Sequence, residues 1–206
     1  MAHSRIAMLP SEYVPGATVV GMTFKDGVVL AAEKRFTYGK FIMSKTGKKI
    51  FRITDKVGAA CAGMISDMQM LVRNMQALIK LREFDLSRPS SPSSVAKLMS
   101  ILMFENRLLP LLTQVIVGGV DEKPEIYVLD PLGSLIKDQY ACVGTGAETA
   151  IGMIEAEYRA NISEEEAKEL AIKAIKSAIQ RDASSGDGVD ILIITKERAK
   201  EETIQF

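Results

Sequence analysis

The chain has 206 residues, the size of one domain or at most two small ones. Lys plus Arg total 26 and Asp plus Glu total 26, so the formal net charge is zero, which argues against a nucleic-acid binder with a broad basic surface. Hydrophobic residues make up 47% and charged residues 25%, which is typical of a globular chain and excludes a disordered one. No apolar run reaches the roughly 18 residues that a membrane helix needs.

Histidine and cysteine are too scarce for the chemistry that they usually carry. The one histidine, His3, lies in a polar N-terminal stretch, and we interpret the two cysteines, Cys61 and Cys142, as small buried side chains. Neither a zinc site, a histidine-based triad nor a disulfide framework is expected, so the sequence predicts no metal and no cofactor. The first residues contain no apolar core of signal-peptide length, so a cytoplasmic protein is expected.

In the first half of the chain, the residue pattern predicts a leader, a set of strands and two helices. Residues 1–16 show no sustained period and are interpreted as a leader that precedes one domain at 17–206. Short runs rich in Val, Ile, Phe and small apolar residues predict strands at 18–24, 28–32, 48–53 and 57–63. Apolar residues at helical spacing then predict helices at 66–84 and 93–109, separated by a Ser- and Pro-rich loop.

The second half repeats this order. Strands are predicted at 113–120, 125–130, 134–137 and 140–144. Two helices follow, and the second begins at a capping box in which Ser163 and Glu166 each bond an amide of the first turn. A last strand at 189–195 precedes a charged tail. This order predicts an α+β fold, a four-layer αββα sandwich with two antiparallel sheets between two helix layers. Periodicity alone leaves an ordinary α+β domain as an alternative.

Four places hold more polar or glycine-rich detail than a core needs, although each taken singly is more often structural than functional. At one of them, strand alternation puts Lys48 and Lys49 on opposite faces, so one lysine is expected to point inward. A buried lysine needs an anionic partner, for which Glu33 and Asp182 are the candidates. The four places are 16–21, 33–35, 47–51 and 180–188.

Taken together, these places resemble one family, the β subunits of the proteasome core particle, which are N-terminal-nucleophile hydrolases. The resemblance covers nearly everything from Ala17 to Thr195, in family order and at family spacing. The archaeal-type β subunit is favoured over an α subunit because no helix is predicted before the first strand. The matching segments are TVVGMTFKDGVVLAAEKR, GKKIF, AGMISDMQML, VGGVDEKPEIYVLDPLG, VGTGAETA and RDASSGDGVDILIIT.

The resemblance implies threonine-type hydrolysis of peptide bonds. The family's nucleophile is the hydroxyl of a threonine that becomes the first residue when a leader is cut off, and the freed α-amino group acts as the base. A lysine lowers the pKa of that hydroxyl, a carboxylate orients the lysine, and a backbone amide binds the oxyanion. These three roles fall on Lys49, Glu33 and the Gly63 amide. The groups that would hold the amine and its water are Thr145, Asp182, Ser185 and Gly186.

The resemblance also implies a substrate pocket beside the nucleophile. Phe36, Gly47 and Cys61 would line the pocket for the side chain that precedes the cut. These residues are apolar or small and uncharged, so an active version of the site is expected to prefer apolar side chains over charged ones.

The chain departs from the family at the nucleophile itself. The family motif is Gly followed by two or three threonines and Val-Gly, and counting back from Gly21 puts Ala17 at the nucleophile position. An alanine can neither attack a peptide nor cut off its own leader. Thr18 comes one residue late, which in a strand means the opposite face. The chain is therefore expected to be inactive and to keep residues 1–16 as an uncleaved propeptide.

Several interpretations remain open at this point. The chain is either a naturally silent β subunit that shares a ring with an active one, or an active subunit whose threonine was replaced to trap the unprocessed form. A purely structural ring subunit and a small-molecule N-terminal-nucleophile amidohydrolase are the alternatives. The expected partners are proteasome α subunits and other β subunits in stacked seven-membered rings, unfolded polypeptide substrates, and a regulatory ATPase acting through the α ring. Neither nucleic acid nor a membrane is expected as a partner.

Overall fold

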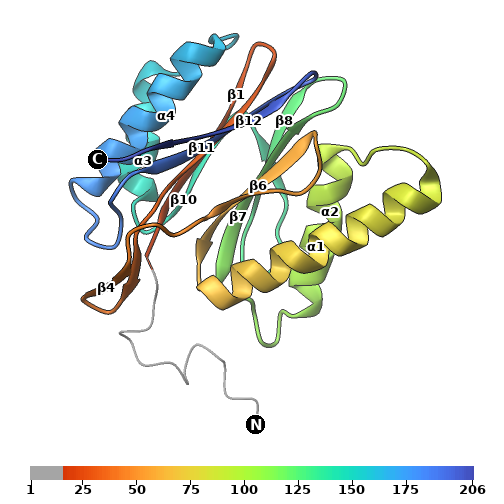
Figure 1. Cartoon of the computed structure of the whole chain (residues 1–206), viewed down its shortest axis with the longest axis horizontal. Helices are drawn as coiled ribbons and strands as arrows, with labels where there is room; N and C mark the ends of the chain where they lie inside the picture. The colour runs from red at the N-terminus through yellow and green to blue at the C-terminus, as the bar shows by residue number, and fades with distance from the viewer. Residues whose placement is uncertain (1–15) are drawn as a thin grey trace.

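The computed structural model describes residues 16–206, so the expected leader, apart from Gly16, lies outside the described residues. Two five-stranded antiparallel sheets lie face to face (Figure 1). The first sheet has the order β10-β1-β2-β11-β12 and is formed by Tyr140–Gly144, Thr18–Phe24, Gly27–Glu33, Val189–Thr195 and Ala199–Ile204. The second has the order β5-β6-β7-β8-β9 and is formed by Ile50–Arg52, Val57–Gly63, Thr113–Val120, Pro124–Leu129 and Ile136–Asp138.

Three separate apolar clusters define four layers. One cluster lies between the two sheets and contains Leu30 and Ile116. A second joins the outer face of the second sheet to two helices, α1 (Ile65–Leu86) and α2 (Pro92–Glu105). The third joins the outer face of the first sheet to α3 (Ala147–Glu157) and α4 (Glu164–Ile179). The predicted αββα sandwich is therefore confirmed.

Glycines let the two sheets approach closely at their centre. A Cβ atom placed on Gly21 of β1 would lie 2.7 Å from the Ile116 side chain, and one on Gly58 of β6 would lie 2.5 Å from Leu192. Real Cβ atoms do not approach other atoms so closely. Larger residues at Gly21 and Gly58 would push the sheets apart, because interiors are packed to near-crystalline density.

Two strand pairings differ from the sequence prediction. A small hairpin of β3 (Phe36–Tyr38) and β4 (Phe41–Ser44) was not predicted, because its strands are short and mostly exposed. The charged tail forms β12, which pairs with β11 at the edge of the first sheet. Its charged residues hide the strand pattern, and charges on an edge strand are a common protection against association with another sheet.

The start of α4 has the predicted capping box. The Ser163 hydroxyl accepts a hydrogen bond from the Glu166 amide at 3.3 Å, and the Glu166 carboxylate accepts one from the Ser163 amide at 3.0 Å. These bonds satisfy two amides that have no partner within the helix. The cap therefore fixes where α4 begins and how its apolar stripe meets the first sheet.

Replacing Ser163 with alanine should lower the free energy of unfolding by about 1 kcal/mol, because one helix-end amide loses its partner. The measurement is urea unfolding followed by circular dichroism. Ser177→Ala, in the last turns of the same helix, is the matched control and should cost nothing, since alanine is the better helix former. Equal losses for the two variants would contradict a capping role for Ser163.

Candidate active site

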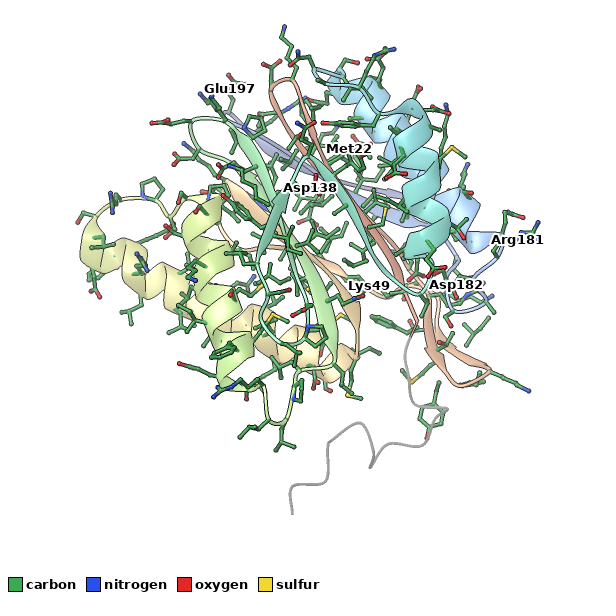
Figure 2. The ribbon with its side chains drawn as sticks, turned by 180° about the vertical axis from the view of Figure 1, so that it is seen from behind. Met22, Lys49, Asp138, Arg181, Asp182 and Glu197 are labelled. Atoms are coloured by element: carbon green, nitrogen blue, oxygen red, sulfur yellow. The ribbon has the colours of Figure 1, made fainter. Side chains whose placement is uncertain are left out.

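The predicted site residues meet at one end of the sandwich, where β1 begins. The end of β2, the end of β6, the end of β10 and the loop after α4 all converge there. Figure 2 shows the labelled side chains Lys49 and Asp182 at this end, close to the start of β1. Residues from distant parts of the chain thus contribute to one small polar region at the end of a mostly apolar interior.

A buried ion pair lies at the centre of this region. The Lys49 side chain is 1% exposed and the Glu33 side chain is 0% exposed, and the Lys49 ammonium donates to Glu33 Oε1. A second bond runs from Lys49 Nζ to the Arg35 carbonyl oxygen at 2.5 Å. The expectation that one lysine points inward to Glu33 or Asp182 is confirmed, and the pair is Lys49 with Glu33. Lys48 points outward and pairs with Glu201.

The other Glu33 oxygen holds two backbone segments together. Glu33 Oε2 accepts from the Arg35 amide at 2.7 Å and from the Gly186 amide at 3.1 Å. Burial raises the pKa of the Glu33 carboxyl, against the opposing effect of Lys49 and these amides. Burial also lowers the pKa of Lys49, against the opposing effect of Glu33 and Asp182. Because burial disfavours the ammonium form, the Lys49 amine gives up its proton more readily than an exposed lysine does.

Asp182 does not pair directly with Lys49 but organises a chain of hydroxyls. Its Oδ2 accepts from Thr145 Oγ1 at 2.6 Å and from Ser185 Oγ at 2.7 Å. Because the Ser185 hydroxyl is already a donor there, Thr18 Oγ1 donates to Ser185 Oγ, at 2.8 Å. Thr145 Oγ1 in turn accepts from the Ala17 amide at 3.1 Å. Asp182 is therefore connected to both Ala17 and Thr18.

Ala17 lies in the middle of these groups and is 1% exposed. Its methyl group belongs to the apolar cluster between the sheets, whereas the Thr18 hydroxyl points to Ser185. The two side chains thus take opposite faces, as strand alternation requires. The residue before them has no room for a side chain, because a Cβ on Gly16 would lie 2.1 Å from the Ser184 Cβ.

Gly63 ends β6 in a conformation that other residues rarely adopt. Its φ is +137°, and a Cβ there would lie 2.1 Å from the Leu112 carbonyl oxygen. Its neighbour Ala62 lies in the same apolar cluster as Ala17. Gly144 of β10 lies against both Ala17 and Ala62. A Cβ on Gly144 would lie 2.1 Å from the Ala17 carbonyl oxygen and 3.1 Å from the Ala62 Cβ. Only glycine suits the position proposed for the oxyanion amide.

The three residues expected to line a substrate pocket are all buried. Phe36 is 8% exposed and Cys61 is 0% exposed, and the Phe36 ring lies against the α-carbon of Gly47. Burial raises the pKa of the Cys61 thiol to about 12, so it stays protonated and is not a nucleophile. A cleft of about 320 Å³ opens nearby between the β3–β4 hairpin and the start of α1. None of the three residues lines that cleft.

Sequence reasoning missed one part of this arrangement. The Arg35 guanidinium bonds Asp187 Oδ2 at 2.8 Å and the Ala183 carbonyl oxygen at 3.0 Å, and it lies against the backbone of Gly186. Arg35 thereby clamps the loop that carries Asp182. The sequence showed only a charged strand end, and neither the clamp nor the Arg35 carbonyl that receives Lys49 has a sequence signal.

Comparison with known proteins gives one consistent result. The family described as "Proteasome subunit" matches residues 14–194. "Proteasome subunit beta 1" of Nitrosopumilus maritimus is 54% identical, over 94% of this chain and 98% of its own length. The protein of the same name from Cenarchaeum symbiosum is 53% identical, over 91% and 97%. "Proteasome subunit beta 2" of Caldivirga maquilingensis is 49% identical, over 92% and 95%.

Replacing Lys49 with methionine should destabilise the chain by about 3–5 kcal/mol, because it leaves the Glu33 carboxyl buried without its cation. The pKa of Glu33 is already raised, and loss of Lys49 raises it further. The folded chain then holds this proton more tightly than the unfolded chain does, so stability present at acid pH is lost as pH rises. Above the ordinary pKa of a glutamate, urea unfolding should show Lys49→Met losing up to about 1.4 kcal/mol per pH unit relative to the unchanged chain.

The matched control is Lys48→Met at the neighbouring, exposed position. Its pair with Glu201 lies on the surface, so the change should cost no more than about 1 kcal/mol and add no pH dependence of this kind. If Lys49→Met showed the same pH profile as Lys48→Met, Glu33 would not depend on Lys49 for its charge.

Proposed function

Because the chain belongs to the proteasome subunit family, as a β-type member, we propose that it is a β subunit of the core particle whose own site cannot hydrolyse peptide bonds. The observation that carries the proposal is the position of Ala17 among otherwise complete partners. Lys49 pairs with Glu33, Asp182 accepts from Thr145 and Ser185, and Thr145 contacts the nitrogen of Ala17, whose side chain has no hydroxyl. On this proposal the chain lacks the hydroxyl of the nucleophile and keeps the other groups of the site.

The surrounding groups have the chemistry that a hydroxyl at position 17 would need. The Lys49 ammonium lowers the pKa of a hydroxyl beside it through its charge. The Gly63 amide would receive the oxyanion that forms when a carbonyl is attacked. Thr145 already contacts the nitrogen of residue 17, which would become the free amine after leader removal. With alanine present, no atom can attack, so we propose that residues 1–16 stay attached as a propeptide.

Exposed apolar side chains support assembly into a larger particle. Phe84 at the end of α1 is 82% exposed, and Leu108 after α2 is 79% exposed. Phe84 lies in α1 and Leu108 in the turn after α2, and these two helices cover the second sheet (Figure 1). Isolated soluble chains rarely leave so many large apolar side chains uncovered, so such a surface indicates protein contacts. Other exposed apolar residues in α1, in α2 or in the turn after α2 are Met70, Leu78, Leu81, Leu86, Ile101, Phe104 and Leu109.

We therefore propose that this helix layer contacts proteasome α subunits and other β subunits in stacked seven-membered rings. The chain then forms part of the wall of a chamber in which active neighbours hydrolyse unfolded polypeptides, fed by a regulatory ATPase through the α ring. A cytoplasmic location accords with this role. None of the helices in 16–206 is long and apolar enough to cross a membrane.

Ala17→Thr should restore leader removal in assembled particles. The introduced oxygen bonds to the Gly16 carbonyl carbon, the bond from that carbon to the nitrogen of residue 17 breaks, and this nitrogen takes up the hydroxyl proton. Water then cleaves the ester, which leaves a carboxylate on Gly16 and a free amine on residue 17. Intact mass should show loss of residues 1–16 from the variant and retention in the unchanged chain.

Ala17→Val is the matched control, because valine has the shape of threonine without the hydroxyl, and it should keep the leader. Adding Lys49→Ala to Ala17→Thr should also keep the leader, since the charge that lowers the hydroxyl pKa is gone. An intact leader in fully assembled Ala17→Thr particles would show that more than the nucleophile is missing.

Assembly is tested by mixing the chain with proteasome α subunits and an active β subunit and measuring particle mass. The chain should enter a ring-sized particle, and Phe84→Lys should reduce the incorporated fraction because it places a charge in an apolar contact. Asn74→Lys adds the same charge at an exposed polar position of α1 and serves as control. A chain that stays monomeric at micromolar concentration would contradict the proposed role.

A further inference from the structure

The β3–β4 hairpin exposes a row of large apolar side chains. Phe41, Met43 and Tyr38 are 68%, 54% and 48% exposed, and Ile42 is 37% exposed. The hairpin is a sheet of its own that pairs with neither five-stranded sheet, and Phe36 is its one buried residue. A two-stranded hairpin by itself is only marginally stable in water. These side chains therefore form a surface that a partner would cover.

A second exposed apolar surface lies at the edge strand β9 and at the turn before it. Ile136 of β9 is 57% exposed and Leu132 of the turn is 55% exposed, and we call these two residues the β9 patch. The turn is held against α2, because the Ser100 hydroxyl donates to the Gly133 carbonyl oxygen at 2.6 Å. A Cβ on Gly133 would lie 2.7 Å from the Phe104 nitrogen, so the turn and the helix are in close contact. The β9 patch is therefore a fixed surface.

The charges beside the two surfaces have opposite signs. Lys40 lies in the turn of the hairpin and is exposed, and the Lys45 side chain, directly after the hairpin, is 67% exposed. Asp138 lies beside the β9 patch and is exposed. The neighbouring Lys137 adds little positive charge there, because its ammonium pairs with Glu125. The hairpin thus has a positive rim and the β9 patch a negative one, which favours contact between them.

The two surfaces lie at opposite edges of the molecule. β5 and β9 are the two edge strands of the second sheet, and the hairpin directly precedes β5 in the chain. The hairpin projects from the lower end of the molecule in Figure 1, and Figure 2 shows Asp138 well apart from it. One chain therefore cannot bring its own hairpin to its own β9 patch. Contact between two different surfaces is head-to-tail, and it continues from copy to copy until a ring closes.

We propose that the hairpin of one copy docks on the β9 patch of a second copy of this chain, so that copies of this chain are direct neighbours. The inference deepens the proposed function and rests on it for placing these neighbours in a proteasome ring. Phe41 packs against Leu132 and Ile136 of the next copy. Lys40 faces Asp138 of the same copy. A substrate or an α subunit on the hairpin would leave the β9 patch uncovered, whereas a second copy covers both surfaces.

The first experiment identifies what covers Phe41 in assembled particles. The chain carries the photo-cross-linker p-benzoylphenylalanine in place of Phe41 and is assembled with proteasome α subunits and an active β subunit. Irradiation should join two copies of this chain, and mass spectrometry of the digest should place the far end of the link within residues 130–138. The matched control has the same cross-linker in place of Leu86, an exposed apolar residue at the end of α1, and should not link to 130–138.

Charge reversal tests the facing pair. Lys40→Glu should lower the yield of linked copies about threefold or more, because two like charges then face each other. Adding Asp138→Lys restores opposite signs and should recover the yield. Asp85→Lys adds the same charge at an exposed position of α1 and should not recover it. Equal recovery by Asp85→Lys would overturn the pairing of Lys40 with Asp138.

The outcomes separate this inference from the proposed function. If the chain enters ring-sized particles but position 41 links to an α subunit, to the active β subunit, to the chain's own leader or to nothing, the proposed function stands and the docking of like copies is wrong. If the chain does not enter such particles, the proposed function fails, and irradiation of the chain alone decides. A link from position 41 to residues 130–138 of another copy then supports the docking, and absence of that link overturns it.

Discussion

The buried pair of Lys49 and Glu33 is the constraint on which the rest of this end of the molecule depends. A lysine and a carboxylate with almost no exposure are costly to bury unless each finds further partners. Glu33 finds the amides of Arg35 and Gly186, and Lys49 finds the Arg35 carbonyl. These bonds join the end of β2, the strand entry at Lys49 and the loop after α4. The pair therefore places three segments from distant parts of the chain, whether or not a reaction occurs among them.

The same loop is held a second time through Asp182, which accepts hydrogen bonds from Thr145 after β10 and from Ser185 of its own loop, and Ser185 in turn accepts one from Thr18 of β1. Arg35 adds a third attachment through Asp187. Because the attachments are separate, the loop's geometry does not depend on any one of them. This redundancy explains how the site keeps its shape around an alanine: none of these bonds involves a side-chain atom of Ala17.

The strength of the periodic signals decided how much could be predicted from the sequence. The long strands, the four helices and the Ser163 cap were predictable because apolar spacing and capping residues act locally. The hairpin at β3 and β4 was missed because only Phe36 is buried in it, and β12 because an edge strand carries charges. At the site, alternation and the cost of an unpaired charge predicted one inward lysine with Glu33 or Asp182 as its partner, and the resemblance to the family singled out Lys49 and Glu33. The Arg35 clamp and the position of the Phe36 ring could not, since they depend on how distant segments pack.

An alanine at position 17 satisfies both the packing and the hydrogen bonding around it. The methyl group lies in the apolar cluster between the sheets and is 1% exposed. In the part of the chain that the structure describes, every buried side-chain nitrogen and oxygen has a hydrogen-bond partner without it. A threonine there would bring a buried hydroxyl that needs a partner of its own, and an unsatisfied one costs about 1–3 kcal/mol. Loss of Lys49 or Glu33, by contrast, leaves a buried charge unpaired. The free energy of folding thus favours alanine at position 17 and also favours keeping the polar groups around it. The presence of those polar groups is therefore evidence for the shape of the site and not for its activity.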